Sequence, residues 1–213
     1  MKKILFFATF SLIVSSLFAQ KAKTIMLNPP DTNRGLSVMK ALSKRASATV
    51  FDTASLKIQD LSDVLWAANG INRPAIGKRT APSAMNAQEV DVYVFLKSGT
   101  DLYDATKNIL NVIADGDNRK LCTGGQEFAA IPPVFCVLVA DISKFKRGND
   151  STKMIIASED AGIVSQNISV FCASVGFSTR PRATMDQKKL RDLLKLKESQ
   201  YLLLNHPVSY KKD

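Results

Sequence analysis

Residues 44–52, with the sequence KRASATVFD, place two cations and two hydroxyl groups close together. Arg45 carries a planar guanidinium whose fork matches the oxygens of a phosphate group, and Ser47 adds a hydroxyl two residues later. Because the segment ends an amphipathic stretch, both side chains can turn to one side. The alternative is a solvated helix terminus, where Lys and Arg favour the negative end of the helix dipole.

A second candidate segment covers residues 79–88, RTAPSAMNAQ. Its small and hydroxyl residues would let backbone amides approach a flat ligand. The side-chain amides of Asn86 and Gln88 can hydrogen-bond the edge of a heterocycle. The alternative is an ordinary surface loop.

A third segment, residues 159–167, has the sequence EDAGIVSQN. Buried polar side chains at Gln166 and Asn167 would need hydrogen-bond partners. Glu159 and Asp160 are neighbours in sequence, so they do not share a helix face. The alternative is a helix that packs on a symmetric partner or caps a loop.

Several kinds of catalytic site are disfavoured by composition. No pair of carboxylates has a spacing that indicates acid–base chemistry, and Gly124-Gly125 is too little for a phosphate loop. The three cysteines match no metal or redox spacing. His206 is the single histidine, which argues against a histidine-based triad or metal site. We therefore expect neither a metal site nor a catalytic side chain of these classes.

The chain of 213 residues is basic, with 29 Lys+Arg against 19 Asp+Glu and a formal charge of +10. Its length suggests one domain, and 46% hydrophobic residues suffice for a core. The cations are scattered rather than gathered in a patch with interleaved aromatic residues, so nucleic acid is not an expected partner. Smaller anionic ligands remain compatible with this charge.

The N-terminus is typical of a targeting segment. Lys2 and Lys3 precede an apolar run over residues 4–18, and Ala19 followed by Gln20 is a plausible cleavage site. The run is shorter than the ~20 residues of a spanning helix, although an uncleaved anchor is the alternative. We expect a signal peptide over residues 1–19, export to a bacterial periplasm, and a polar linker or arm over residues 20–35.

Periodicity of apolar residues predicts the elements of the remaining domain, residues 36–213. Residues 71–88 contain Pro74, Gly77 and Pro82 and are expected to form a loop. The expected helices cover residues 36–46, 61–68, 154–175 and 186–196, and the expected strands cover residues 90–96, 102–105, 109–114, 133–140 and 201–208. Helices mixed with a small sheet, without regular alternation, indicate an α+β class.

Two segments carry finer expectations. Residues 133–140, PVFCVLVA, are a continuous apolar run that predicts a central strand buried on both faces. Gly162 lies inside the longest helical pattern, where glycine costs about 1 kcal/mol relative to alanine, so we expect close packing there. Cys136 and Cys172 have apolar neighbours and are expected in the core.

Taken in order, the motifs resemble the nitroreductase family of flavin enzymes over roughly residues 36–210. The Arg-x-Ser motif with Phe-Asp comes first, and DVLWAANGINRP, KRTAPSAMNAQEVDVYVF and ASEDAGIVSQNISVFCASVGF follow. These last three, with DLYDATKNILNVIADGDNRKL, are most similar to the branch that includes the peptide azoline oxidases. A single motif of this kind is weak evidence for the family, but five motifs in the same order are specific for it.

The resemblance implies a fold, a cofactor and partners. The fold would be an α/β/α sandwich with a mixed, mainly antiparallel sheet, assembled as an intertwined homodimer that binds FMN at its interface. Electrons would pass through FMN from NAD(P)H, or from a membrane or protein donor, to a small acceptor such as a nitroaromatic or quinone. The hydride chemistry belongs to the flavin, which agrees with the absence of histidine and carboxylate machinery.

The resemblance also assigns cofactor-binding residues. Arg45 and Ser47 would hold the FMN phosphate and ribityl chain with the backbone of Ala46, and Lys211 would complete the phosphate site. The isoalloxazine would be lined from the second subunit, and further contacts would come from a loop and from the segment near N5. These residues are Pro82, Ser83, Ala84 and Asn86 from the second subunit, then Gln126, Pro181, Ala183 and Thr184.

The sequence departs from the family pattern at three places. Ala48 and Thr49 stand where many members carry a second cation, Ala183-Thr184 replaces a frequent Glu-Gly pair, and Ser209 replaces a glycine. These departures concern FMN affinity and the electron donor more than the fold. Two alternatives to an oxidoreductase stay open: an exported flavin- or ligand-binding module without turnover, and an interaction protein with an empty pocket.

Overall fold

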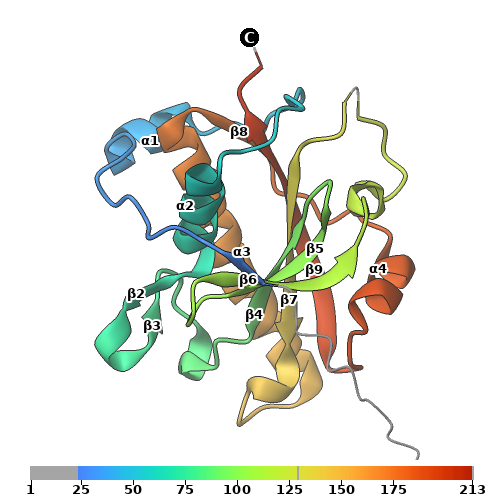
Figure 1. Ribbon diagram of the computed structural model, residues 1–213. Helices are drawn as coiled ribbons and strands as arrows, with labels where there is room; N and C mark the ends of the chain where they lie inside the picture. Colours follow the sequence, from blue (N-terminus) through green and yellow to red (C-terminus); the bar gives the residue numbers. More distant parts are fainter. Residues whose placement is uncertain (1–23, 129, 213) are drawn as a thin grey trace, which may run out of the picture.

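A seven-stranded sheet forms the centre of the part of the chain that the structure describes, residues 24–128 and 130–212 of a computed structural model (Figure 1). Its order is β1-β6-β5-β4-β7-β9-β8, and every neighbouring pair is antiparallel. The strands are β1 (Thr24–Met26), β4 (Val90–Phe95), β5 (Gly99–Asp104), β6 (Ile109–Asp115), β7 (Val134–Asp141), β8 (Phe177–Thr179) and β9 (Gln200–Tyr210).

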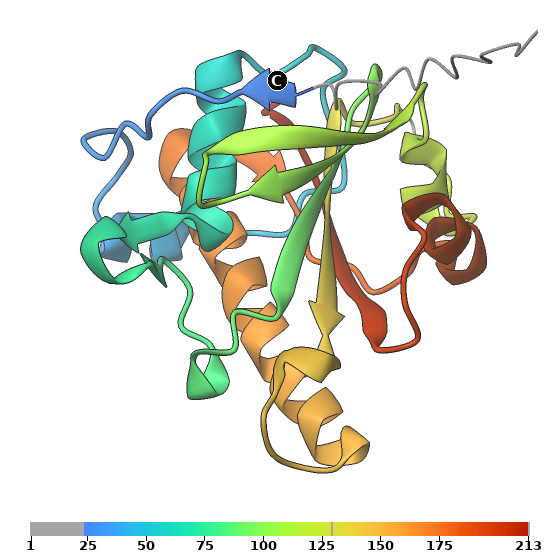
Figure 2. The ribbon, with the colours of Figure 1, turned by 60° about the horizontal axis from the view of Figure 1, so that its bottom comes forward.

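Helices cover both faces of this sheet. The helices are α1 (Val38–Lys44), α2 (Ile58–Asn69), α3 (Asp150–Val175) and α4 (Gln187–Leu194), with short 3-10 turns η1 (Pro74–Ile76), η2 (Ala84–Asn86), η3 (Arg119–Thr123) and η4 (Ile142–Lys144). Figure 2 shows α2 and α3 on one side of the sheet and α4 on the other. The expected α+β sandwich with a mainly antiparallel sheet is confirmed.

Each face of the sheet has its own hydrophobic core. Val64 of α2 and Ala161 of α3 meet the side chains of β4 and β7 that point to one face. Leu190 of α4 packs with Phe135 and Val137 on the opposite face. All eight residues of β7 are buried, which confirms the expected central strand. Cys122, Cys136 and Cys172 are free and buried, so the expectation for the last two is also confirmed.

The longest helix, α3, begins and ends at residues suited to those positions. The side chain of Asn149 accepts a hydrogen bond from the backbone N–H of Thr152, and Gly176 ends the helix at a φ of 78°. The expected close packing at Gly162 is wrong within this chain, because a Cβ added there meets no atom within 4 Å among the described residues. Gly162 is half-buried and faces away from the core of this chain.

Helix α1 exposes most of its apolar side chains. It is shorter than the expected 36–46, and only Ala41 is buried. The exposed fractions of Met39 and Leu42 are 76% and 45%. The apolar spacing therefore predicted the helix but not a face that packs on the core of this chain.

The segment expected as a linker or arm is fixed to the domain where the structure describes it. Strand β1 pairs with β6 at the sheet edge, and Arg34 makes ion pairs of 2.8 Å with Asp60 and 2.7 Å with Asp63. The expected signal peptide, residues 1–19, lies outside the described residues. Among the helices within them, none is long and apolar enough to cross a membrane.

The segment expected as a loop, residues 71–88, contains a small hairpin. Strands β2 (Ile71–Arg73) and β3 (Lys78–Arg79) pair beside the turn η1. The strands predicted over residues 102–105 and 109–114 are confirmed as β5 and β6, which form a hairpin with Asn108 at a φ of 53° in the turn. Strands β2 and β3 are short and have prolines and glycines nearby, so they give too little periodicity to be predicted from the sequence.

Candidate functional site

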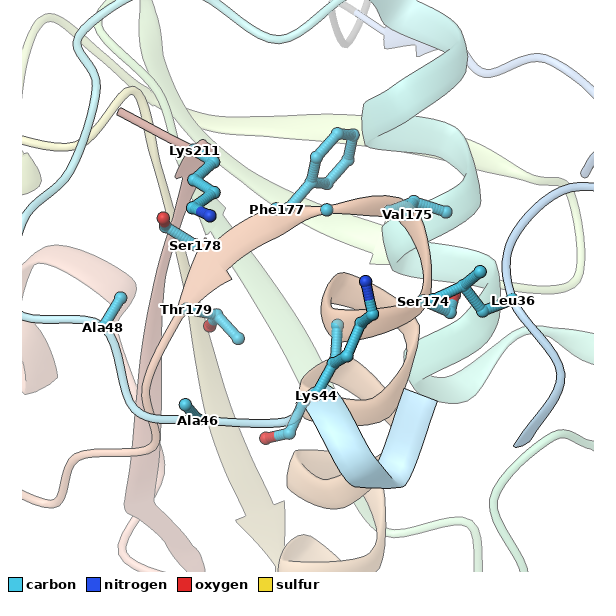
Figure 3. Close-up of a pocket in the computed structure, with 13 residues that line it drawn as sticks. Leu36, Lys44, Ala46, Ala48, Ser174, Val175, Phe177, Ser178, Thr179 and Lys211 are labelled. Carbon is cyan, nitrogen blue, oxygen red and sulfur yellow. The ribbon is translucent and has the colours of Figure 1, made fainter. Parts of the chain in front are cut away.

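A cavity of about 540 Å³ opens where the end of α1 passes β8 and the C-terminal turn of α3 (Figure 3). Two of its lining residues are lysines, Lys44 from α1 and Lys211 from just past β9. The other residues are small, hydroxylated or apolar: Leu36, Ala46, Ala48, Ser169, Ala173, Ser174, Val175, Gly176, Phe177, Ser178 and Thr179. No carboxylate lies among these residues, so the cavity is positively charged and suits an anion.

The wall formed by residues 45–48 is held in place by backbone hydrogen bonds. Helix α1 ends as the N–H of Arg45 donates to the carbonyl of Ala41 at 2.9 Å. The N–H of Ala48 then donates to the carbonyl of Thr179 at 2.9 Å. These bonds fix the segment beside β8 and place Ala46 and Ala48 on the cavity.

The structure changes which cation of the first segment borders the cavity. Of the residues assigned to the phosphate from the sequence, Ala46 and Lys211 line it. Arg45 and Ser47 are exposed on the same segment but are not part of the lining. Lys44, the preceding residue, borders the cavity.

A buried hydrogen-bond chain supports the cavity from behind. The hydroxyl of Thr179, on the cavity wall, lies 3.2 Å from Nδ1 of His206, and Nε2 of the same ring lies 2.7 Å from the hydroxyl of Ser165. His206 is fully buried, and burial lowers the pKa of its imidazole to about 3. The imidazole is therefore neutral at physiological pH, and its place behind the wall makes it a structural group.

A second group of expected residues gathers around Arg182. Gln126 accepts a hydrogen bond from the Arg182 guanidinium at 2.6 Å, and the carbonyl of Thr184 accepts one from the side chain of Asn205 at 3.0 Å. Pro181, Ala183 and Thr184 are exposed on the segment that follows β8. The structure therefore brings Gln126 close to this segment.

The third group lies in a different place. Pro82 and Ser83 border a cavity of only about 10 Å³ that they share with Asp160 of α3, and Asn86 is exposed. The N–H of Ala84 donates to the carboxyl of Asp160 at 2.8 Å. None of these residues lines the lysine-bearing cavity of the same chain.

Beneath this loop two carboxyl groups meet. Glu89 is fully buried, and neither of its carboxyl oxygens meets an N–H or O–H donor among the described residues. Its side-chain partner is the carboxyl of Asp160. Burial, and then the contact with Asp160, raise the pKa of Glu89 to about 7. A proton on Glu89 can be donated in a hydrogen bond to the carboxyl of Asp160.

Comparison with known proteins agrees with this architecture. The family description "Nitroreductase family" matches residues 42–210, which is more than half of the chain. The chain belongs to the nitroreductase family. The family expected from the sequence is thereby confirmed, and the protein is an oxidoreductase of the nitroreductase type.

Individual relatives show how far the likeness extends. A protein of Methanocaldococcus jannaschii named as a nitroreductase is 26% identical over 197 residues, covering 88% of this chain and 98% of its own. A crystal structure of a protein from Ralstonia eutropha, also named as a nitroreductase, has a TM-score of 0.83 and 30% identity, covering 89% of this chain and 90% of that one.

A more distant structure shares the fold alone. It comes from Staphylococcus epidermidis and is named as an NAD(P)H:FMN oxidoreductase. Its TM-score is 0.63 at 12% identity, over 87% of this chain and 92% of that one. Similarity therefore extends over most of the domain even where few residues are shared.

Sequence reasoning missed several residues of the site. Lys44 was visible in the first segment, but Arg45 was preferred because its fork matches phosphate. Ser178 and Thr179 follow Gly-Phe, and no local pattern links them to α1, which lies far away in sequence. The signal for Arg182 was a cation within a short strand-like segment. If such an arginine is buried, it needs several acceptors around it.

Proposed function

We propose that this protein is a homodimeric, FMN-dependent oxidoreductase that holds the FMN phosphate in the lysine-bearing cavity. The observation that supports this most is the chemistry of the lining: two lysines, several hydroxyls and no carboxylate among the described lining residues. A phosphomonoester carries about −1.5 to −2 charges at neutral pH and needs such donors. The volume of about 540 Å³ is in the range of small-molecule sites.

Each part of the site has a separate task in this proposal. Lys44 and Lys211 neutralise the phosphate, and the hydroxyls of Ser178 and Thr179 complete its hydrogen bonds. The segment from Pro181 to Thr184, which is exposed except at Arg182, offers backbone groups along the ring system. Bound FMN supplies the electron transfer between NAD(P)H, or another donor, and a small acceptor such as a nitroaromatic or a quinone. The name of the Staphylococcus epidermidis relative supports this cofactor and donor.

A second copy of the chain completes the proposed site. The loop that carries Ser83 and Asn86 lies away from the cavity of its own chain, so it would reach the flavin of a partner. Exposed apolar side chains on α1, such as Met39, and the open surface beside Gly162 on α3 support a partner that packs there. We propose an intertwined homodimer of this kind.

The N-terminal sequence supports export to a periplasm. Lys2-Lys3 and the apolar run after them have the pattern of a cleaved signal peptide. Because nicotinamide cofactors are cytoplasmic, an exported enzyme would take electrons from a membrane quinol or a partner protein. This donor is the alternative to NAD(P)H within the same proposal.

The cofactor is tested by releasing it. Residues 20–213 are purified and denatured, and the supernatant is compared with FMN, FAD and riboflavin by absorbance and chromatography. We expect FMN in near one-to-one amount, and reduction of the bound flavin by NADH, NADPH or a quinol analogue. Bound FMN that no donor reduces would indicate a binding module without turnover. Failure to bind FMN even in excess would reject the proposal.

The phosphate site is tested by alanine variants of neighbouring cations. Lys44→Ala should weaken FMN binding about tenfold, the scale of a lost hydrogen bond to a charged group. Arg45→Ala tests the sequence-based alternative and should weaken binding less, because Arg45 is outside the lining. Lys40→Ala, on the same helix and exposed, is the matched control. Flavin fluorescence titration measures all three dissociation constants, and a larger effect at Arg45 than at Lys44 would contradict the assignment.

A further inference from the structure

Two arginines follow β8, and the same aromatic ring lies beneath both. The guanidinium carbon of Arg180 lies 5.2 Å from the centre of the Phe128 ring, and that of Arg182 lies 5.0 Å from it. Arg180 also lies 5.9 Å from the centre of the Phe51 ring, and the two rings are 5.8 Å apart. Arg180 therefore rests in a corner formed by two phenylalanines.

Arg182 has a complete set of partners. Its guanidinium donates to the carbonyls of Cys122 at 2.9 Å and Thr123 at 2.8 Å. It also donates to the side chains of Asn205 at 3.1 Å and Gln126 at 2.6 Å. These bonds fasten η3 and the loop after it to β9, so the role of Arg182 is structural.

Arg180 has no such partners among the described residues. Its Nε is buried there without an acceptor, and none of the ion pairs of the described chain involves it. The residue as a whole is half-buried. The rings hold the cation in place without neutralising it.

The proximity of the two cations adds an electrostatic reason for an anionic partner. After burial, the charge of Arg180 is the next cause that lowers the pKa of Arg182. Two like charges that share one aromatic ring repel each other, and an anion beside Arg180 would relieve the repulsion. The guanidinium fork suits a carboxylate, which it can bind through two parallel hydrogen bonds.

This position is separate from the proposed phosphate cavity. Side chains alternate between the two faces of a strand. Thr179 contacts His206, whose other nitrogen meets Ser165 of α3, whereas Arg180 stacks on Phe128 on the face that α4 covers. Arg180 also precedes Pro181, the first residue of the segment proposed to border the flavin.

We propose that Arg180 binds the carboxylate of an aromatic acceptor and so selects acidic substrates at the flavin. The partly exposed ring of Phe128 provides apolar surface for the aromatic part of such a molecule, and the buried ring of Phe51 supports it from behind. This inference rests on the proposed function for the location of the flavin. The arginine and its two rings form an anion site whether or not the flavin turns over.

The experiment compares two nitroaromatics of similar size, 4-nitrobenzoate and the neutral 4-nitrobenzyl alcohol, with the FMN-loaded enzyme. In the wild type, we expect a higher kcat/KM for the acid than for the alcohol. Arg180→Ala should lower this ratio about tenfold, mainly through KM for the acid, with the alcohol nearly unchanged. Arg180→Lys keeps the charge but loses the fork, so an intermediate ratio is expected. Arg147→Ala, an exposed arginine elsewhere, is the matched control.

A second measurement separates this inference from the proposed function. Benzoate binding to the purified full chain is followed by calorimetry in the wild type, Arg180→Ala and Arg147→Ala, with thermal unfolding as the check on folding. Benzoate that binds the wild type and is lost only in Arg180→Ala supports the anion site even if no flavin turnover is found. An unchanged acid-to-alcohol ratio together with unchanged benzoate binding overturns it. A loss of FMN affinity in Arg180→Ala without a change in selectivity also overturns it, because the arginine then serves the cofactor.

Discussion

Two buried polar sites lie five residues apart on α3. Each keeps a buried titratable side chain uncharged, but the two do so in opposite ways. At Ser165, a hydroxyl meets Nε2 of His206, and Thr179 meets the other ring nitrogen. At Asp160, a carboxyl meets the carboxyl of Glu89, which has no N–H or O–H donor among the described residues. Both Glu89 and His206 are fully buried.

The difference lies in the balance of donors and acceptors. A hydroxyl both donates and accepts, so a neutral imidazole between two hydroxyls is satisfied whichever nitrogen carries the proton. Two carboxylates only accept, so their contact requires a bound proton. Burial accordingly lowers the pKa of His206 and raises the pKa of Glu89. Both groups are kept uncharged: the imidazole of His206 does not take up a second proton, and the carboxyl of Glu89 stays protonated.

These two groups should oppose each other in the pH dependence of stability. The pKa of His206 falls from 6.5 unfolded to about 3 folded, so the unfolded chain binds more protons between these values and stability rises with pH. The pKa of Glu89 rises from 4.5 unfolded to about 7 folded, so stability falls with pH between those values. Between pH 4.5 and 6.5 the two slopes cancel, which predicts a plateau from this pair.

The largest expected effect is the acid limb caused by His206. As pH falls from 6.5 to about 3, the wild type should lose roughly 4–5 kcal/mol of unfolding free energy from this group. His206→Asn removes the titration, and its amide keeps one hydrogen bond to Ser165 or Thr179. Urea unfolding at a series of pH values measures the slope. The variant should be less stable at pH 7 but should lack this acid limb, and an unchanged acid limb would show that other groups produce it.

The next largest effect belongs to Glu89. Between pH 4.5 and 7 its ionisation in the unfolded chain should remove about 3 kcal/mol of stability. Glu89→Gln replaces the shared proton by an amide donor to Asp160, so the loss on raising pH should disappear. With that slope gone, stability of the variant should fall continuously below pH 6.5, because His206 is no longer opposed. A plateau that persists in Glu89→Gln would contradict the assignment.

The fold followed from the sequence where periodicity was strong. Continuous apolar residues placed β7 at the centre, and repeated apolar spacing gave α2 and α3. The pattern in α1 did not reveal that its apolar residues are exposed, because periodicity shows that a helix has an apolar face but not what covers it. Gly162 misled for a similar reason, since an open surface and a close contact both tolerate glycine.

The site was less predictable, because it joins segments far apart in the chain. Family motifs indicated that residues 45–47 and Lys211 belong together, but only the structure shows that Lys44, at the end of α1, borders the cavity. Glu89 and Asp160 are more than 70 residues apart, so no local spacing marks them as a pair. Arg180 and Arg182 look alike in sequence, and their different roles follow from the acceptors around each one.

The smallest of the three effects tests whether the carboxyl of Asp160 holds the loop of residues 83–88 in place. Asp160→Ala removes the acceptor for the N–H of Ala84 and should cost about 1–3 kcal/mol, the range for a buried donor left without a partner. The amide hydrogen of Ala84 should then exchange faster with solvent. Slow exchange in this variant would show that the loop does not depend on Asp160.

Asp160→Asn is the matched control and separates the two functions of this side chain. Its amide oxygen can still accept from Ala84, so exchange at that amide should remain slow. Its NH₂ group can donate to Glu89, which stabilises the ionised carboxylate and lowers the raised pKa of that group. The variant should therefore keep the loop, and its fall in stability above pH 4.5 should be smaller than in the wild type but still present, because burial continues to raise the pKa of Glu89. An undiminished fall would show that burial alone holds the proton on Glu89 and that the contact with Asp160 contributes nothing to it.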